Sequence, residues 1–268
     1  MKIEPDNLFD LNPLVIIALH LPELRRGHKA ISMGWLEDYV LQNTALFSEC
    51  GVPAVILQEE TLNTSMAFPE SIAVLSVLGS TIHREFPKLQ LGIIMQAHDG
   101  VSPLAVANSC GASFVRLKVF VGAMIKSEGI QQGCGVAARD YRSMIGREDI
   151  KILADVHDRT GLPLTDISVE LASEWAVRTG ADGLILTGFT YEESLQRLTS
   201  VRESGIHVPL FLGGGATEDN VAEVLKFANG VVVSSALKRK NPAPTDTILW
   251  DRDLVMRFMD AVCKTAVH

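Results

Sequence analysis

The sequence predicts one α/β domain folded as a (β/α)8 TIM barrel, and three observations lead to this prediction. Short apolar runs alternate with stretches of helical period, a βα repeat that implies parallel strands joined by right-handed crossovers. The chain has 268 residues, and a barrel of this kind usually needs about 250. The glycine-rich turn that opens a doubly wound sheet is missing, because His20-Leu21-Pro22 follows the first apolar run. We therefore expect a single domain over residues 1–268, with residues 1–12 as an acidic lead-in.

Eight apolar runs have the length expected for strands that are buried on both faces. Glycines at positions 51, 111 and 180 stand shortly before three of these runs, where they indicate turns. The expected strands are, in chain order, 14–19, 53–57, 89–95, 114–119, 150–156, 182–186, 208–212 and 230–233.

Between these runs, apolar residues recur at the spacing of a helix that covers a sheet. Gly51 is expected just past the end of the first helix, while Ser168 and Thr217 are expected to cap the helices that follow them. The expected helices are 35–50, 69–82, 103–109, 137–145, 168–179, 192–203, one that begins after Thr217, and 250–262. The connection 120–135 holds four glycines and reads as a long, mobile βα loop that closes over the strand ends as a lid.

Composition argues against several classes of protein. A net charge of -8 disfavours nucleic-acid binding, which needs a basic face to neutralise phosphates. The four cysteines form no CxxC pair, so neither a zinc knuckle nor a disulfide framework is indicated. The acidic start is unlike a signal peptide, and no apolar window is long enough for a transmembrane helix. We expect a cytoplasmic protein, and the sequence leaves open a homo-oligomer and peripheral association with a membrane.

Two loops of small residues follow the last two expected strands. They are Gly213-Gly214-Gly215 and Ser234-Ser235. Glycine lets the backbone approach a ligand closely, and the loops after strands 7 and 8 of such barrels frequently hold a phosphate. The sequence therefore predicts a small phosphorylated ligand bound by Gly213, Gly214, Gly215, Ser234 and Ser235, against the alternative that the glycines only form a tight turn.

Several stretches together resemble the BtpA/SgcQ family of barrel proteins. They are Leu19-His20-Leu21-Pro22, Gly122-Ala123-Met124, Ala154-Asp155-Val156-His157, 212–220 and 230–238. The resemblance extends from about residue 15 to residue 238. It implies a TIM barrel of the phosphate-binding kind, with relatives linked to photosystem I biogenesis and others found among sugar-utilisation genes. It implies no single reaction.

The alternation of side chains along a strand predicts which of them point into the barrel. In the fourth strand these are Arg116, Lys118 and Phe120, and in the fifth they include Asp155 and His157. Other polar residues stand at the carboxyl ends of the first, second, third and sixth strands, namely His20, Glu59 or Glu60, His98 and Thr187. Buried ionisable groups of both signs need either mutual salt bridges or a ligand.

The candidate catalytic residues are Asp155, His157, Lys118, Glu59 and His20. Asp155 and His157 suit general acid/base work, or together with Glu59 they suit a divalent metal ion as cofactor. The alternative is that Asp155 forms a salt bridge with Lys118 or Arg116 and that His157 only closes the barrel mouth. Lys118 has a further interpretation, because a desolvated lysine beside Arg116 can have a lowered pKa and form a Schiff base.

Two classes of function remain. The first is an enzyme that acts on a small phosphorylated sugar or nucleoside metabolite. The second is a non-catalytic barrel that serves as an assembly or regulatory factor. Retention of His20, Asp155 and His157 favours the enzyme, whereas four positions that depart from the family pattern favour the second class; they are Gln58, Ile94, Ala97 and Phe120.

Overall fold

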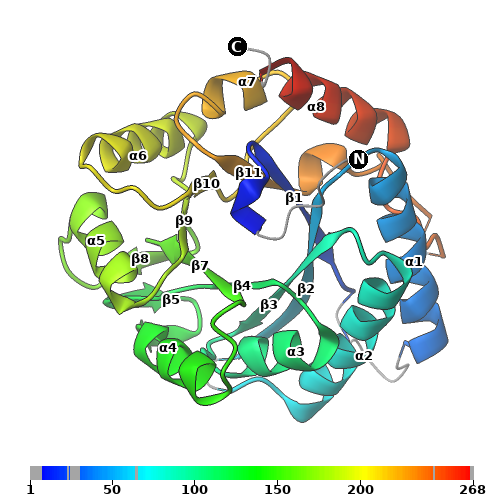
Figure 1. Ribbon diagram of the computed structural model, residues 1–268, viewed down its shortest axis with the longest axis horizontal. Helices are drawn as coiled ribbons and strands as arrows, with labels where there is room; N and C mark the ends of the chain where they lie inside the picture. The colour runs from blue at the N-terminus through cyan, green and yellow to red at the C-terminus, as the bar shows by residue number, and fades with distance from the viewer. Residues whose placement is uncertain (1–7, 23, 25–30, 64–65, 244, 266–268) are drawn as a thin grey trace.

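The computed structural model confirms a closed barrel of eight parallel strands surrounded by helices (Figure 1). It describes residues 8–22, 24, 31–63, 66–243 and 245–265, so residues 1–7 of the expected lead-in lie outside the described part. The strands follow each other around the barrel in the order β1-β11-β10-β9-β7-β4-β3-β2. No described helix is both long enough and apolar enough to cross a membrane.

All eight expected strands are present, with ends that differ from the sequence prediction by a few residues. The largest difference is at β2, which runs on beyond the expected end and pairs with β3 through a register shift after Glu59. The barrel strands are β1 (Leu14–His20), β2 (Ala54–Asn63), β3 (Gln90–Ala97), β4 (Phe114–Leu117), β7 (Lys151–Val156), β9 (Gly183–Leu186), β10 (Leu210–Leu212) and β11 (Gly230–Val233).

The helices also follow the expected order. They are α1 (Met33–Glu49), α2 (Pro69–Glu85), α3 (Ser102–Cys110), α4 (Gly135–Met144), α5 (Val169–Thr179), α6 (Tyr191–Glu203), α7 (Val221–Val224) and α8 (Arg252–Thr265). Ser168 caps α5 as predicted, because its hydroxyl accepts the Leu171 N–H at 3.3 Å. The cap predicted at Thr217 is wrong. Asn220 directly precedes α7, which has only 4 residues, and its side chain closes the preceding turn by accepting the Thr217 N–H.

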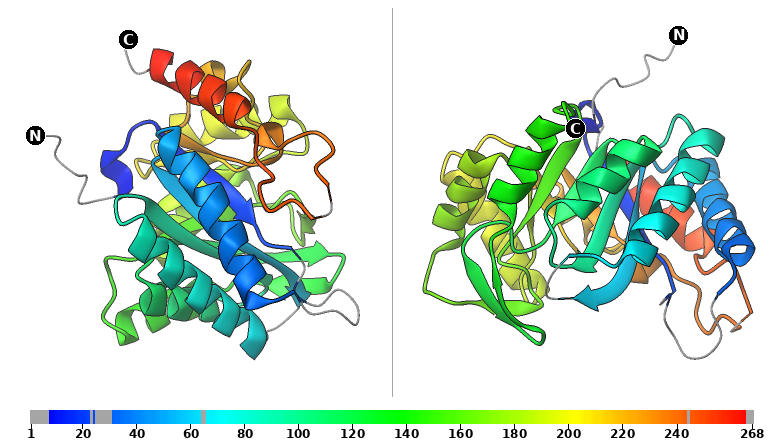
Figure 2. Two further views of the ribbon diagram at one scale, coloured as in Figure 1. Left: turned by 90° about the vertical axis from the view of Figure 1, so that its right-hand side faces the viewer. Right: turned by 90° about the horizontal axis from the view of Figure 1, so that it is seen from below.

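The apolar core has two layers, one between sheet and helices and one inside the barrel. The inner layer includes Ile16, Phe114 and Phe211. A short 3-10 helix, η1 (Leu8–Asp10), adds Leu8 to this layer, with 3% of its surface exposed. It lies at the end of the barrel opposite to the β5–β6 hairpin, which is described below (Figure 2). The amino-terminal end of the barrel is therefore closed by apolar side chains.

Residues 120–135 lie in the connection from β4 to the start of α4, where the sequence predicted a long βα loop. Residues within it form a hairpin of β5 (Ala123–Lys126) and β6 (Gly129–Gln132), and β5 also pairs with β8 (Gly161–Pro163). Gly129 has φ +118°, a backbone conformation that glycine adopts at little cost, and this allows the tight turn at the hairpin tip. The hairpin extends from the carboxyl-terminal end of the barrel (Figure 2).

Candidate functional site

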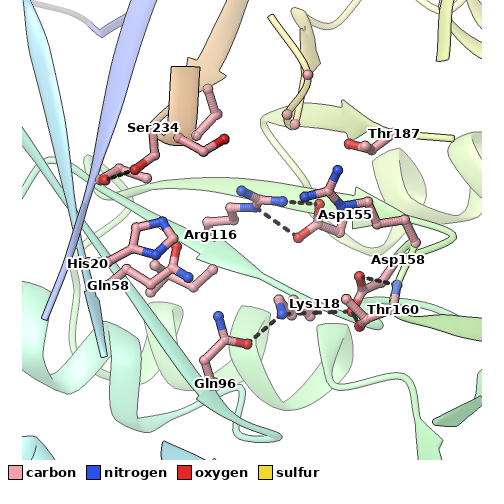
Figure 3. A pocket seen from close by; sticks show the side chains of 18 of the residues that line it. His20, Gln58, Gln96, Arg116, Lys118, Asp155, Asp158, Thr160, Thr187 and Ser234 are labelled. Atoms are coloured by element: carbon pink, nitrogen blue, oxygen red, sulfur yellow. Dashed lines mark hydrogen bonds and ion pairs between the residues drawn. The ribbon is translucent and has the colours of Figure 1, made fainter. Parts of the chain in front are cut away.

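A cavity of about 620 Å³ opens at the carboxyl ends of the barrel strands (Figure 3). All eight strands contribute side chains or following loops to its wall, and the hairpin tip adds Lys126, Ser127 and Glu128. The wall contains His20, Lys118, Asp155 and His157 of the predicted catalytic set, together with both predicted phosphate loops. Glu59 is the one predicted catalytic residue that does not line it.

The glycine loop lies beside β9 and has no space for larger residues at its start. A Cβ on Gly213 would come within 2.3 Å of the Thr187 hydroxyl. The Asn220 amide donates a hydrogen bond to the Gly215 carbonyl at 3.0 Å and so holds the end of the loop. Ser234, in the second loop, donates to the Ala18 carbonyl at 2.9 Å, which fixes the end of β11 against β1. The two loops therefore face one cavity, and phosphate binding between them stays a prediction.

Arg159 is a cavity residue that the sequence analysis missed. A Cβ placed on Gly214 would lie 3.4 Å from both terminal nitrogens of the Arg159 guanidinium, so the side chain reaches from the β7 end to the glycine loop. Within the described part of the chain, no carboxylate pairs with Arg159. A basic residue soon after the Ala-Asp-Val-His motif was the only signal that could have found it, because nothing local shows that its side chain turns toward the glycines.

Arg116 and Asp155 form a two-pronged salt bridge on the floor of the cavity (Figure 3). Arg116 Nη2 donates to Asp155 Oδ1 at 2.8 Å, and Arg116 Nε donates to Oδ2 at 2.9 Å. Both side chains point inward, as strand alternation predicts, and the Asp155 side chain is only 4% exposed. Since both carboxylate oxygens accept from Arg116, the structure favours the alternative of a structural pair. Among the described residues, no hydrogen bond joins Asp155 to His157, so the predicted acid/base pair is not formed.

His157 lies where β7 ends and the chain turns. Its φ of +53° is unusual for a residue with a side chain, and its carbonyl accepts from Arg197 Nη1 at 3.2 Å. Burial, helped by the charge of Arg197, lowers the pKa of the imidazole. The ring is therefore neutral at pH 7.

Lys118 points toward the middle of the cavity but does not pair with Asp155. Its ammonium donates to the Gln96 side-chain oxygen at 2.5 Å and lies 3.9 Å from Asp158 Oδ2 (Figure 3). The closer partner of Asp158 is Lys126, at 2.7 Å. The predicted Lys118–Asp155 pair is therefore wrong, because the β7–β8 connection brings Asp158 nearer to the lysine.

These contacts change two pKa values. Burial lowers the pKa of Lys118, although Asp158 and Asp155 act against it. Burial alone would raise the pKa of Asp158, but Lys118, Lys126 and the Thr160 N–H outweigh it and hold that pKa below its usual value.

A histidine–carboxylate pair does exist in the cavity, and it is formed by His20 and Glu60. His20 Nδ1 lies 3.0 Å from Glu60 Oε1, and Gln58 Nε2 donates to the same oxygen at 2.9 Å. Because Nδ1 faces Glu60 and suits a donor role there, Nε2 is the ring nitrogen left to face the cavity without a carboxylate partner among the described residues. Burial would raise the pKa of Glu60, but the contacts with His20 and Gln58 outweigh it and lower that pKa.

The prediction for Glu59 is wrong, and strand alternation explains why. Val55 and Leu57 face the helices, so Glu59 does as well, while Gln58 and Glu60 face the cavity. The Glu59 carboxylate is 1% exposed and accepts the Ser71 hydroxyl at 3.2 Å. Among the described residues, no three His, Cys, Asp or Glu side chains are grouped so that they could hold a metal ion.

Phe120 lies elsewhere than expected, whereas His98 follows the carboxyl end of β3 as expected. Val119 has φ +44°, which breaks the strand alternation, so Phe120 joins the core between sheet and helices instead of pointing inward. His98 Nε2 forms a hydrogen bond with the Gln132 carbonyl of β6 and thereby contacts the hairpin.

Comparison with known proteins identifies relatives of this chain. The BtpA family model matches residues 12–264. The photosystem I biogenesis protein BtpA of Synechocystis sp. is 35% identical over 56% of this chain, and that match covers 53%, about half, of the relative. An uncharacterised protein of Pyrococcus horikoshii is 27% identical over 86% of this chain and 89% of its own length. Phosphoribosyl anthranilate isomerase of Thermus thermophilus has the same fold, with a TM-score of 0.53, 12% identity, and coverage of 94% of this chain and 98% of that one.

Proposed function

The chain belongs to the BtpA family, and from the geometry of its cavity we propose that it is an enzyme acting on a small phosphorylated sugar or nucleoside metabolite. The observation that carries the proposal is the Arg159 guanidinium, which lies against Gly214 without a carboxylate partner among the described residues. A cation beside backbone that is free of side chains suits a phosphate group.

The charges of the cavity support an anionic ligand. Its lining holds five Arg or Lys side chains and four Asp or Glu side chains, in a chain whose net charge is -8. Arg116 and Lys126 are neutralised by close carboxylates. Lys238, by contrast, lies over the face of Trp250, 5.0 Å from the ring centroid. The excess positive charge in a concave site attracts anions and raises their local concentration.

The His20–Glu60 pair supplies chemistry that the phosphate loops lack. Glu60 orients the imidazole, as the carboxylate does in other histidine–carboxylate pairs, and leaves Nε2 able to take up or give a proton. A ligand held by its phosphate near Gly214 could present its carbon chain to this nitrogen, since both groups line one cavity. The proposed reaction class is therefore proton transfer on a phosphorylated carbon skeleton.

Replacement of Gly214 by Asp tests this proposal. The new carboxylate would lie beside Arg159 and occupy the anion position from within the protein, so that inorganic phosphate and ribose 5-phosphate should no longer raise the melting temperature. Gly34→Asp is the matched control, because a Cβ at Gly34 has no atom within 4 Å and Gly34 does not line the cavity. Ribose without phosphate should give no shift with any variant.

Two results would contradict the proposal. One is that neither inorganic phosphate nor ribose 5-phosphate raises the melting temperature of the unmodified protein. A ligand present at about 100 times its dissociation constant should stabilise the folded protein by about 2.7 kcal/mol, so the concentration series should reach well above the millimolar range. The other is an equal shift in the Gly214→Asp and Gly34→Asp variants.

A non-catalytic assembly factor is the second candidate function, and one surface feature favours it. A groove of about 530 Å³ between the hairpin and the helices α4 and α5 has no charged residue in its lining. Ile130 at its edge is 63% exposed, and Val136 is 53% exposed. The Synechocystis relative is named for photosystem I biogenesis, which agrees with a role in assembly.

The two functions can be separated by complementation in the source organism. The enzyme hypothesis expects Gly214→Asp to abolish the function of the chain in cells while Ile130→Glu, on the groove, has little effect. The assembly hypothesis expects Ile130→Glu to abolish that function while Gly214→Asp has little effect.

A further inference from the structure

Three lysines line the cavity, and their contacts differ in kind. Lys126 lies 2.7 Å from a carboxylate oxygen of Asp158, and its side chain is 4% exposed. Lys238 lies over the Trp250 ring. Lys118 has a neutral amide, Gln96, as its hydrogen-bond partner, and its nearest carboxylate oxygen is 3.9 Å away. Lys118 thus differs from Lys126 in having a neutral amide, in place of a carboxylate, as its closest partner.

This environment favours the neutral amine of Lys118. Removing an ammonium ion from water is costly unless a carboxylate contacts it, and the side chain is only 16% exposed. Burial lowers its pKa, and the nearby charges of Arg116 and Lys126 act in the same direction, against Asp158 and Asp155. A larger fraction of this amine than of an ordinary lysine therefore carries a free electron pair at pH 7.

The position of Lys118 suits a reaction on a ligand held at the glycine loop. Its ammonium points into the cavity between Gln96 and Asp158, and the floor beside it is the Arg116–Asp155 pair (Figure 3). The His20–Glu60 pair is near enough for the charge of Lys118 to affect the pKa of Glu60. Lys118, the His20–Glu60 pair and the proposed anion site therefore line one cavity.

We propose that Lys118 is the nucleophile of this site and forms an imine with a ligand carbonyl, which makes phosphorylated aldehydes and ketones the substrate class. The inference rests on the phosphate binding proposed above. In the step itself, Lys118 Nζ forms a bond to the carbonyl carbon, and one amine proton passes to the carbonyl oxygen. The resulting carbinolamine takes up one proton from solvent and loses water, which leaves a protonated C=N bond. No oxidant, reductant or cofactor takes part.

Reduction with borohydride tests the proposal because it converts an imine irreversibly into a stable amine. The full chain is incubated with dihydroxyacetone phosphate and sodium borohydride, and the modified lysine is then located by peptide mass mapping. We expect one adduct per chain, on Lys118. No adduct should form when dihydroxyacetone, which lacks the phosphate, replaces dihydroxyacetone phosphate, or when the Gly214→Asp variant replaces the unmodified protein. Lys118→Met should lose the adduct, whereas the control Lys240→Met, at an exposed lysine outside the cavity, should keep it.

The failure of this inference can be told apart from the failure of the proposed function. If inorganic phosphate raises the melting temperature of the unmodified protein and of Lys118→Met but no adduct forms on Lys118, the imine is overturned and phosphate binding stands. An adduct that persists in Lys118→Met overturns the imine as well. If inorganic phosphate gives no shift in the unmodified protein, the proposed function itself is overturned.

Discussion

At the scale of single residues, the Arg116–Asp155 pair shows how a cavity can contain strong contacts that are structural. The guanidinium donates to both carboxylate oxygens, so Asp155 has no oxygen left over for His157. The predicted catalytic residues therefore do not form one interacting group. Asp155 pairs with Arg116 on the floor of the cavity, while His20 forms the histidine–carboxylate pair with Glu60.

A double-mutant cycle tests the structural role of this pair. Arg116→Met or Asp155→Leu alone leaves a buried charge without its partner and should lower the free energy of unfolding by about 3–5 kcal/mol. The double variant should lose less than the sum of the two single losses, because no unpaired charge remains. Urea unfolding of the four proteins measures this. Losses that simply add would show that the two side chains do not stabilise each other.

At the scale of secondary-structure elements, the β5–β6 hairpin replaces the loop that the sequence predicted. Lys126 at its tip forms the ion pair with Asp158, which also accepts from the backbone and hydroxyl of Thr160. One carboxylate thus fixes both the β7–β8 connection and the hairpin. The hairpin can act as a lid only if this ion pair opens, and the lid role remains a prediction.

Asp158→Asn should loosen the hairpin and leave the barrel intact. The variant leaves Lys126 buried without its carboxylate, so we expect a loss of about 3 kcal/mol at neutral pH and faster tryptic cleavage after Lys126. The folded-state pKa of Asp158 is below its unfolded value, so its stabilisation is present above about pH 4 and is lost as the pH falls through the folded-state pKa. The stability difference between the two proteins should therefore shrink as the pH is lowered.

Urea unfolding between neutral pH and about pH 4 measures the free energy of unfolding of both proteins. Timed trypsin digestion at neutral pH measures the rate of cleavage after Lys126. Arg147→Met serves as the control, because the ion pair of Arg147 with Asp149 lies on the exposed surface and contributes little. Equal cleavage rates after Lys126 in all three proteins would mean that Asp158 does not hold the hairpin.

At the scale of the whole molecule, the two ends of the barrel differ in polarity. The end closed by η1 is apolar: Leu8 is buried in the inner core layer, and the Phe9 ring centroid lies 6.3 Å from that of Phe211. The opposite end carries the polar cavity. In barrels of this class, activity belongs to the carboxyl-terminal end of the strands and stability to the amino-terminal end.

Leu8→Ala tests this separation. Truncation of a buried leucine should lower the free energy of unfolding by about 2–5 kcal/mol, since it removes apolar contacts and leaves a cavity. The affinity for inorganic phosphate, measured by calorimetry below the melting temperature, should stay the same. Met144→Ala, at a side chain that is 73% exposed, should change neither quantity. A loss of affinity in Leu8→Ala would show that the two ends are coupled.

The sequence by itself determined the architecture. Eight apolar runs separated by helical repeats predict parallel strands, because only a sheet covered by helices buries such runs on both faces. Alternation along the fourth and fifth strands correctly placed Arg116, Lys118 and Asp155 inside the barrel. The same rule, applied to the second strand, would have placed Glu60 rather than Glu59 in the cavity.

Only the tertiary structure decided which of these side chains contact one another. Arg159 meets Gly214 although 55 positions separate them in the chain, and Asp158, rather than Asp155, lies beside Lys118. The left-handed turns at Val119 and His157 redirect the chain where the strands end, so alternation no longer predicts orientation there. Local patterns report the period of a strand or helix, whereas these contacts depend on how the loops of neighbouring strands pack together, and no local pattern encodes that packing.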